Sequence, residues 1–242
     1  MKIFMAASAL VVLMFTNCAL AEPDESIATT YADDGLRQID LKFGSIKQSS
    51  QDRSSAATFG FGYGLTEYWF SEIYVSYERV GSEGTHVDAY SWQNSFLLTH
   101  GQYPMDVGLY TEIEYPQDRS EGYQITFGPL LQTEFGLTKL NANLFFQRNY
   151  RADFSNRMQL SYQWQLKRRW TSGLEFGFQG FGEMGPWDQW APRHEQSHRL
   201  GPAIFGKILL DGKQLNYNAA ILIDASDATH SSTFRSQVVF GF

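Results

Sequence analysis

Cysteine, proline and basic residues are all scarce in this sequence. The 242 residues include one cysteine, Cys18, and seven prolines. Because Cys18 has no second cysteine to pair with, the chain cannot form an internal disulfide or a metal site of several thiolates. Asp and Glu number 26 against 19 Lys and Arg, which gives a formal net charge of −7. This acidic balance argues against nucleic-acid binding, which needs a basic surface.

Long hydrophobic runs are also missing beyond the first 21 residues. No later stretch reaches the roughly 18 consecutive apolar residues that a transmembrane helix needs, and the mean hydropathy is −0.32. No helical membrane span is therefore visible beyond the first 21 residues. These features do not exclude a transmembrane β-barrel, because each of its strands presents only alternate residues to lipid.

The N-terminus has the pattern of a secretory signal. Lys2 is followed by an apolar run over 3–15 and by the small-residue triplet Ala19–Leu20–Ala21, which predicts cleavage after Ala21 and export from the cytoplasm. A transmembrane anchor is the first alternative, but the apolar run is too short for one. Lipid attachment at Cys18 is the second, but the residues before it lack the Leu and small residues of a lipidation site.

Two regions follow the predicted signal peptide, 1–21. Residues 22–35 are acidic and show no periodicity, which predicts a short, flexible periplasmic lead. From residue 36 to 242 the chain alternates polar and apolar residues in segments of about ten, the signature of β-strands. We expect twelve strands, at about 37–47, 55–64, 70–80, 87–98, 105–115, 122–132, 139–149, 157–167, 171–182, 198–209, 215–224 and 233–242.

An even number of strands is what a closed up-and-down barrel needs if both termini lie on one side. The connections also alternate in character. Five are short, at 65–69, 99–104, 133–138, 167–170 and 211–214, and the six between them are longer or more polar. The fold class we predict is therefore all-β: a single closed antiparallel transmembrane barrel over 36–242, with both termini and the short turns in the periplasm.

A soluble β-sandwich or lipocalin-like barrel would alternate in the same way. Three features favour the membrane barrel. The polar positions carry many charges and glutamines, which suits a wet lumen. Aromatic residues, 16% of the chain, recur near strand ends as in the girdles of membrane barrels, at Tyr68, Trp69, Tyr103, Tyr115, Tyr150 and Trp170. The last predicted strand also ends on an aromatic residue, Phe242.

The last nine residues, "FRSQVVFGF", resemble the C-terminal strand of outer-membrane β-barrels of Gram-negative bacteria. The resemblance implies a Gram-negative outer-membrane location, contact with its lipids, and recognition by the barrel-assembly machinery. The residues it assigns to that assembly signal are Phe234, Val238, Phe240 and Phe242. The resemblance is to a class of fold and implies no particular substrate.

A channel is the function that the lumen pattern favours. The alternation turns acidic and basic residues inward, and the acids outnumber the bases, which predicts passage of small polar or cationic solutes. The candidate lumen residues are Asp40, Lys42, Glu72, Glu78, Glu112, Glu114, Glu175, Lys207 and Arg235. In a barrel this narrow the same residues could pair with each other instead. The alternative is therefore a non-conducting structural or interaction barrel that presents its outer loops.

The outer loops hold the remaining candidates. The longest, 183–197, carries Trp187 and Trp190, which could recognise a solute or simply anchor the loop. His194, His198 and His230 are weak metal candidates, since two histidines four apart on an extended chain lie about 13 Å apart. A rim hydrolase is the third functional possibility, although no nucleophile–histidine motif is recognisable. We expect neither a catalytic site nor a cofactor.

Overall fold

The computed structural model describes residues 23–30, 32–48, 53–82, 84–99, 101–154, 156–225 and 231–242. The predicted signal peptide, 1–21, lies outside the described residues. Within the described ranges the chain forms twelve strands and one short 3₁₀ helix, η1 (Arg119–Glu121). The strands are β1 (Arg37–Gln48), β2 (Ser54–Thr66), β3 (Trp69–Val80), β4 (His86–Leu97), β5 (Met105–Pro116), β6 (Tyr123–Phe135), β7 (Thr138–Tyr150), β8 (Gln159–Thr171), β9 (Leu174–Pro186), β10 (Ser197–Leu210), β11 (Lys213–Asp224) and β12 (Ser231–Gly241).

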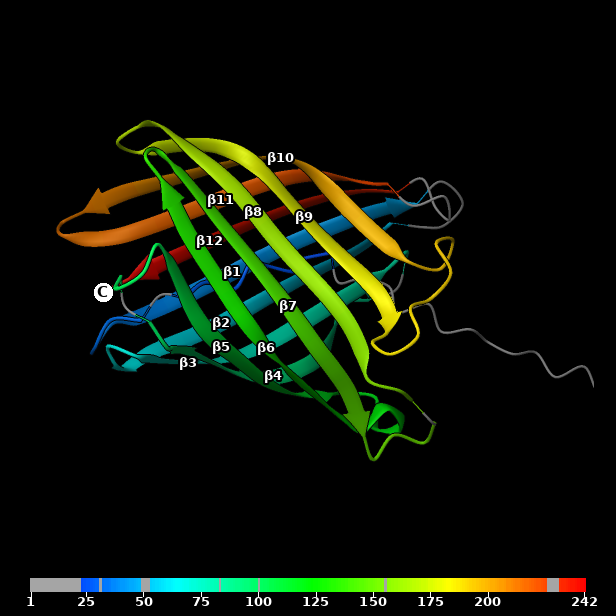
Figure 1. The fold of residues 1–242 in the computed structure, drawn as a ribbon. Helices are drawn as coiled ribbons and strands as arrows, with labels where there is room; N and C mark the ends of the chain where they lie inside the picture. The colour runs from blue at the N-terminus through cyan, green and yellow to red at the C-terminus, as the bar shows by residue number, and fades with distance from the viewer. Residues whose placement is uncertain are drawn as a thin grey trace, which may run out of the picture.

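The strands close into one antiparallel barrel (Figure 1). Each strand pairs with its neighbours in sequence, and β12 returns to pair with β1 over Gln38↔Gly241 to Gln48↔Ser231. Every strand therefore has a partner on both sides, and no row of backbone N–H and C=O groups is left open. This confirms the predicted fold class and the predicted number and order of strands.

The prediction was wrong at the connection between β8 and β9. Its sequence "KRRW" was assigned to a turn at 167–170, but β8 continues to Thr171 and the turn lies at 172–173. Lys167 and Arg169 stay in the strand because both reach the same carboxylate, Glu175 on β9, with N–O distances of 3.0 and 3.9 Å. Three consecutive basic residues have the polar composition of a turn, but here Glu175 on the neighbouring strand forms ion pairs with Lys167 and Arg169.

The two ends of the barrel differ in their connections. At one end, here called the turn end, four connections are two-residue turns, at 67–68, 136–137, 172–173 and 211–212, and the connection between β4 and β5 is longer. Asp211 and Gly212 both have positive φ, 49° and 81°, as the tight turns that match strand twist require. The other end, here called the loop end, carries longer connections such as 117–122 and 187–196. The C-terminus lies at the turn end (Figure 1).

Apolar side chains cover the outside of the barrel and polar side chains line its inside. On β1, Leu41 and Phe43 point outward and are exposed, whereas Asp40 is only 2% exposed. The same alternation exposes Ile73 on β3 by 60% and Ile113 on β5 by 43%. A soluble barrel would bury these residues. No helix among the described residues is long and apolar enough to cross a bilayer.

The N-terminal segment, residues 23–30 and 32–35, lies inside the barrel. It begins beside β1 at Gly44 and reaches the turn end, where the Gly35 N–H donates to the Gly64 carbonyl over 2.9 Å. The sequence had predicted a flexible lead outside the barrel, so these residues are placed differently from that expectation. Their low hydrophobicity suits an interior that is itself polar, a feature that the composition of the segment alone does not reveal.

Barrel closure generates a prediction for the last residue. Phe242 completes the β1–β12 seam, since its N–H donates to the Arg37 carbonyl and its own carbonyl accepts from the Arg37 N–H, over 2.9 and 3.2 Å. Deleting Phe242 removes both bonds and an outward aromatic ring. We expect less folded barrel in the membrane fraction, measured as the heat-sensitive fast-migrating band on gels. Phe242→Tyr is the control and keeps the seam, and an unchanged yield of the deletion variant would contradict the prediction.

Candidate functional site: the barrel lumen

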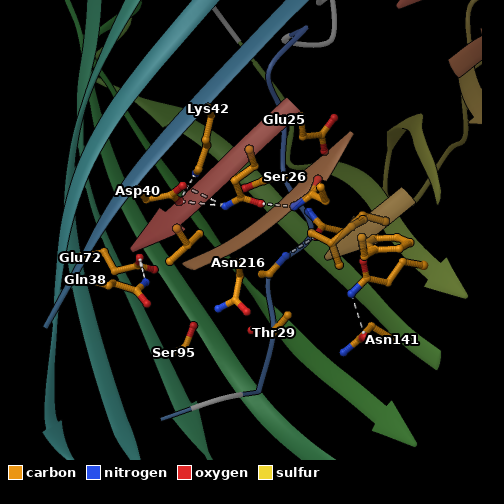
Figure 2. A pocket seen from close by; sticks show the side chains of 18 of the residues that line it. Glu25, Ser26, Thr29, Gln38, Asp40, Lys42, Glu72, Ser95, Asn141 and Asn216 are labelled. Carbon is orange, nitrogen blue, oxygen red and sulfur yellow. Dashed lines mark hydrogen bonds and ion pairs between the residues drawn. The ribbon is translucent and has the colours of Figure 1, made fainter. Parts of the chain in front are cut away.

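A continuous cavity of about 1650 Å³ occupies the lumen. It is bordered by Asp118 and Glu121 at the loop end and by Gly136 and Gly212 at the turn end. The cavity therefore touches residues of both rims. The N-terminal segment forms part of its wall, and Figure 2 shows Ser26 and Thr29 of this segment among the side chains around the cavity.

Hydrogen bonds and an ion pair hold the N-terminal segment against the barrel wall. Thr58 donates its hydroxyl to Asp24 over 2.6 Å, and the Glu25 carboxylate meets the buried Arg199 guanidinium at 2.9 Å. Further along, the Ala28 N–H donates to the Gln163 side-chain oxygen at 2.6 Å, and Asn143 donates to the Ala28 carbonyl at 2.8 Å. Wall side chains thus satisfy backbone groups of a segment that forms no strand.

Apolar contacts secure the middle of the N-terminal segment. Ile27 belongs to a buried cluster with Phe181, Phe205 and Leu222, and Ala28 packs against a second cluster that contains Tyr110. Sequence reasoning missed these inward-facing apolar residues. A signal was available, because Phe181 and Phe205 fall on the polar parity of β9 and β10, where they break the alternation.

Glycines provide the space that the N-terminal segment occupies. A side chain at Gly44 would overlap the backbone of Pro23 and Asp24, and one at Gly64 would overlap the carbonyl of Asp33. Both glycines face inward from strands where any larger residue would displace the segment.

Two polar networks link the wall strands. In the first, the Asp40 carboxylate accepts from the Tyr74 hydroxyl at 3.0 Å and from the Gln237 amide at 2.9 Å, and Lys42 lies 3.9 Å away. Glu72 joins this network, because it accepts from the same Tyr74 hydroxyl at 2.7 Å. Asp40, Lys42 and Glu72 were all predicted to face the lumen (Figure 2).

The second network is a chain of amide side chains that starts at a buried cation. Arg235 is 1% exposed and donates to Gln179 at 2.6 Å. Gln179 donates to Gln165, Gln165 to Asn141, and Asn141 to Gln132, over 3.2, 2.9 and 2.9 Å. These bonds connect β12 to β6 across the interior through groups that are each donor and acceptor.

Charge is unevenly distributed around the cavity. Its lining includes thirteen Asp or Glu residues but only six Lys or Arg residues. Acids gather in the loop-end half of β5 and the adjacent loop, at Glu112, Glu114, Asp118 and Glu121. Bases gather near the turn end of β7, β8, β10 and β11, at Lys139, Lys167, Arg169, Lys207 and Lys213.

The predicted lumen residues fall into three groups. Glu112, Glu114, Glu175 and Lys207 line the cavity, as do the three members of the first network. Arg235 faces inward but is enclosed by its partners. Glu78 does not line the cavity; it lies near the loop end of β3 and accepts from the Ser54 hydroxyl at 3.1 Å.

Comparison with known proteins gives similarity in structure and none in sequence. No protein-family model matches the chain, and no curated protein matches it. The COG4313 outer membrane channel from Pseudomonas putida F1 is similar at a TM-score of 0.66 with 11% identity, over 90% of this chain and 100% of that one. The KdgM porin, solved in complex with disordered oligogalacturonate, is similar at 0.57 with 6% identity, over 85% of this chain and 99% of that one.

This chain has the outer-membrane β-barrel fold. The positions of the C-terminal residues agree with it, because Phe234, Val238, Phe240 and Phe242 all lie on the outward parity of the last strand. Phe234 packs near Phe43 across the seam at 6.5 Å, and the Phe240 and Phe242 rings stack at 5.8 Å.

The long loop of the outer-membrane barrel, 187–196, lies at the rim. Trp187 meets Phe146 edge to face at 6.4 Å, and Phe146 stacks on the exposed ring of Phe127 on the outward face. The loop is tied by Asp188, whose carboxylate accepts from Arg157 at 2.6 Å, and this hydrogen bond lowers the pKa of Asp188. Trp190 is exposed, and neither tryptophan lines the lumen cavity.

His86, His194 and His198 each contact different partners. His198 hydrogen-bonds the Tyr162 hydroxyl and the Gln196 amide, both at 2.9 Å. His194 lies 3.5 Å from its exposed neighbour Glu195, and His86 meets the Gly84 carbonyl. His230 lies outside the described residues. Within the part of the chain that the structure describes, no three or more His, Cys, Asp or Glu residues are grouped as metal ligands.

The glycine contacts predict how to dislodge the N-terminal segment. Gly44→Ala places a methyl group where the Pro23 backbone lies, so the segment must leave β1. We expect faster maleimide labelling of a cysteine introduced at Ser26 by at least about tenfold, which corresponds to about 1.4 kcal/mol in the opening equilibrium. Gly84→Ala is the matched control, because nothing lies within 4 Å of its added methyl. Equal labelling rates in the two variants would contradict this account.

Proposed function

We propose that this outer-membrane barrel passes small polar solutes, with a preference for cations, through the lumen beside its N-terminal segment. The observation that carries the proposal is the lining of the lumen cavity, with thirteen acidic and six basic residues. A surplus of fixed negative charge in a narrow, low-dielectric passage concentrates cations and excludes anions.

The acids are placed where they act on entering solutes. Glu114 and Glu121 lie at the loop-end mouth, and Glu112 lies further in, held by Gln93 at 2.7 Å and by Tyr110 at 3.0 Å. Glu114 has no base paired with it among the described residues. By contrast, Lys139 and Lys167 near the turn end are paired with Glu134 and Glu175. The uncompensated charge is therefore acidic at the loop-end mouth.

The proposal includes the orientation of the barrel. We infer that the loop end faces outward from the cell and the turn end faces the periplasm, as short turns and longer loops do in bacterial outer-membrane barrels. It also includes removal of residues 1–21 after export. Cleavage after Ala21 would start the mature chain one residue before Pro23, so the new N-terminus would lie close to the segment held in the lumen.

The similarity to the KdgM porin supports the fold of this chain, but it does not support passage of the oligogalacturonate that KdgM binds. Oligogalacturonate is a chain of carboxylates, and thirteen lining acids would repel it. Neutral polar molecules and cations of small size fit the charge and the restricted width of this lumen better.

A non-conducting barrel is the second candidate. The observation that favours it is the N-terminal segment itself, which crosses the lumen and is fixed by both polar and apolar contacts. In that case the outer loops would carry the function. Recording from the intact barrel in planar bilayers separates the two candidates, since a barrel that never conducts eliminates the channel.

Substitution of the mouth acids tests the selectivity. In Glu112→Gln/Glu114→Gln two acidic groups are replaced by neutral amides with little change in volume, and we expect the cation-over-anion permeability ratio to fall by roughly twofold or more. The reversal potential under a salt gradient measures this ratio. Glu195→Gln, on the exposed outer loop, is the control and leaves the ratio unchanged. A conducting double variant with the same reversal potential as the parent would rule out these acids as the selectivity determinants.

A further inference from the structure

A row of small polar residues crosses the outward face of three adjacent strands. Ser71 on β3 lies opposite Asn94 on β4, and Asn94 lies opposite Thr111 on β5. The alternate residues on these strands, Glu72, Gln93 and Glu112, line the lumen or point toward it, so the polar row faces the bilayer. The next outward row toward the loop end is apolar, with Ile73, Trp92 and Ile113 in register and all exposed.

Two indole groups use part of the hydrogen-bonding capacity of this row. Trp69 donates its Nε1–H to the Asn94 side-chain oxygen at 3.0 Å, and Trp92 donates to the Ser71 hydroxyl at 2.9 Å. Trp69 is fixed further by stacking on Phe96 at 5.6 Å. Asn94 is thereby covered to 7% exposure. Among the described residues, neither the Asn94 amide nitrogen nor the Thr111 hydroxyl hydrogen-bonds with another side chain.

Asn94 and Thr111 of the polar row lie at the floor of a cavity of about 290 Å³. Its walls are apolar apart from Glu112, which also borders it, and the apolar residues are Trp69, Trp92, Phe96, Ile113, Ile125 and Phe127. This volume lies close to the lower end of the range for small-ligand sites, which are typically apolar with a few placed polar groups. We call this depression, with its two polar floor residues, the outer notch.

Polar groups without partners are costly at a surface that faces hydrocarbon. The Asn94 amide nitrogen only donates, and the Thr111 hydroxyl can donate as well as accept, so both groups can bind a ligand that brings an acceptor oxygen. No Lys or Arg lines the notch, which suits a neutral carbonyl better than a phosphate. The aromatic and aliphatic walls fit an alkyl chain attached to that carbonyl.

The position of the outer notch along the barrel axis fits the same ligand. Trp69 is the first residue of β3, and Asn94 lies three residues before Leu97, the last residue of β4. Both are therefore near the turn end, where tryptophans mark the boundary between hydrocarbon and headgroups. The ester carbonyls of phospholipids lie just inside that boundary.

We propose that the outer notch binds one ester-linked acyl chain of a membrane phospholipid. Its carbonyl oxygen accepts hydrogen bonds from the Asn94 amide and the Thr111 hydroxyl, and its alkyl chain lies between Trp92 and Phe127. The site opens on the outward face of the barrel, and its occupation does not depend on the proposed channel activity.

Native mass spectrometry of the whole barrel tests the site. The probes are phosphatidylethanolamine with ester-linked palmitoyl chains and its ether-linked analogue, which lacks the carbonyl oxygens. We expect the barrel to retain the ester lipid about tenfold better than the ether lipid, because two hydrogen bonds of modest net strength account for a difference of this size. Thr111→Val keeps the shape of the side chain and removes one donor, so the preference for the ester lipid falls severalfold. The double variant Thr111→Val/Asn94→Leu loses this preference.

Ser236→Ala is the matched control, because it deletes a hydroxyl from the outward parity of β12, on the far side of the β1–β12 seam from the notch. It leaves the preference unchanged. Equal retention of both lipids by the parent barrel overturns the proposal, as does an ester preference that survives in Thr111→Val. If the barrel retains no lipid and instead forms a dimer that Trp92→Ala disrupts, the notch binds a second copy of the chain, and this result also overturns the proposal. Conductance measured on the same variants reports separately on the channel.

Discussion

Pairing of β1 with β12 is the interaction on which the rest of the structure depends. A strand surrounded by hydrocarbon cannot leave its N–H and C=O groups without partners. The seam from Gln38↔Gly241 to Gln48↔Ser231 joins the two edges, on β1 and β12, that an open meander would leave unpaired. Closure creates an inside and an outside. The alternation of the strands then places Leu41 in lipid and Asp40 in the lumen.

An interior made of polar side chains needs partners of its own. The Asp40–Tyr74–Glu72 network and the amide chain from Arg235 to Gln132 satisfy part of this need between wall strands. The N-terminal segment satisfies more of it, since Gln163 and Asn143 bind its backbone and Arg199 binds its carboxylate. The segment that narrows the lumen is thus also one of the elements that make the polar wall stable.

The fold could be predicted from the sequence because period-two alternation is a local property of each strand. The predicted inward positions of Glu112 and Lys207 follow from that parity alone, and both residues line the lumen cavity. The position of the N-terminal segment could not be predicted, because it depends on gaps that Gly44 and Gly64 leave on strands distant in sequence. The turn at 172–173 was misplaced for a similar reason, since the cross-strand acid Glu175 fixes Lys167.

Residues that break the alternation of a strand have a physical reason on both faces of the barrel. Inside the barrel, an apolar residue at a polar position, such as Phe181, marks the place where another part of the chain packs. Outside the barrel, polar residues such as Asn94 and Thr111 break the apolar pattern, and the Trp69 indole satisfies only the Asn94 side-chain oxygen among the described residues. A hydrogen-bonding group that faces hydrocarbon must find its partner in the bilayer or pay the full cost of desolvation. A break in alternation therefore indicates a partner on either face, and the face determines whether that partner is protein or lipid.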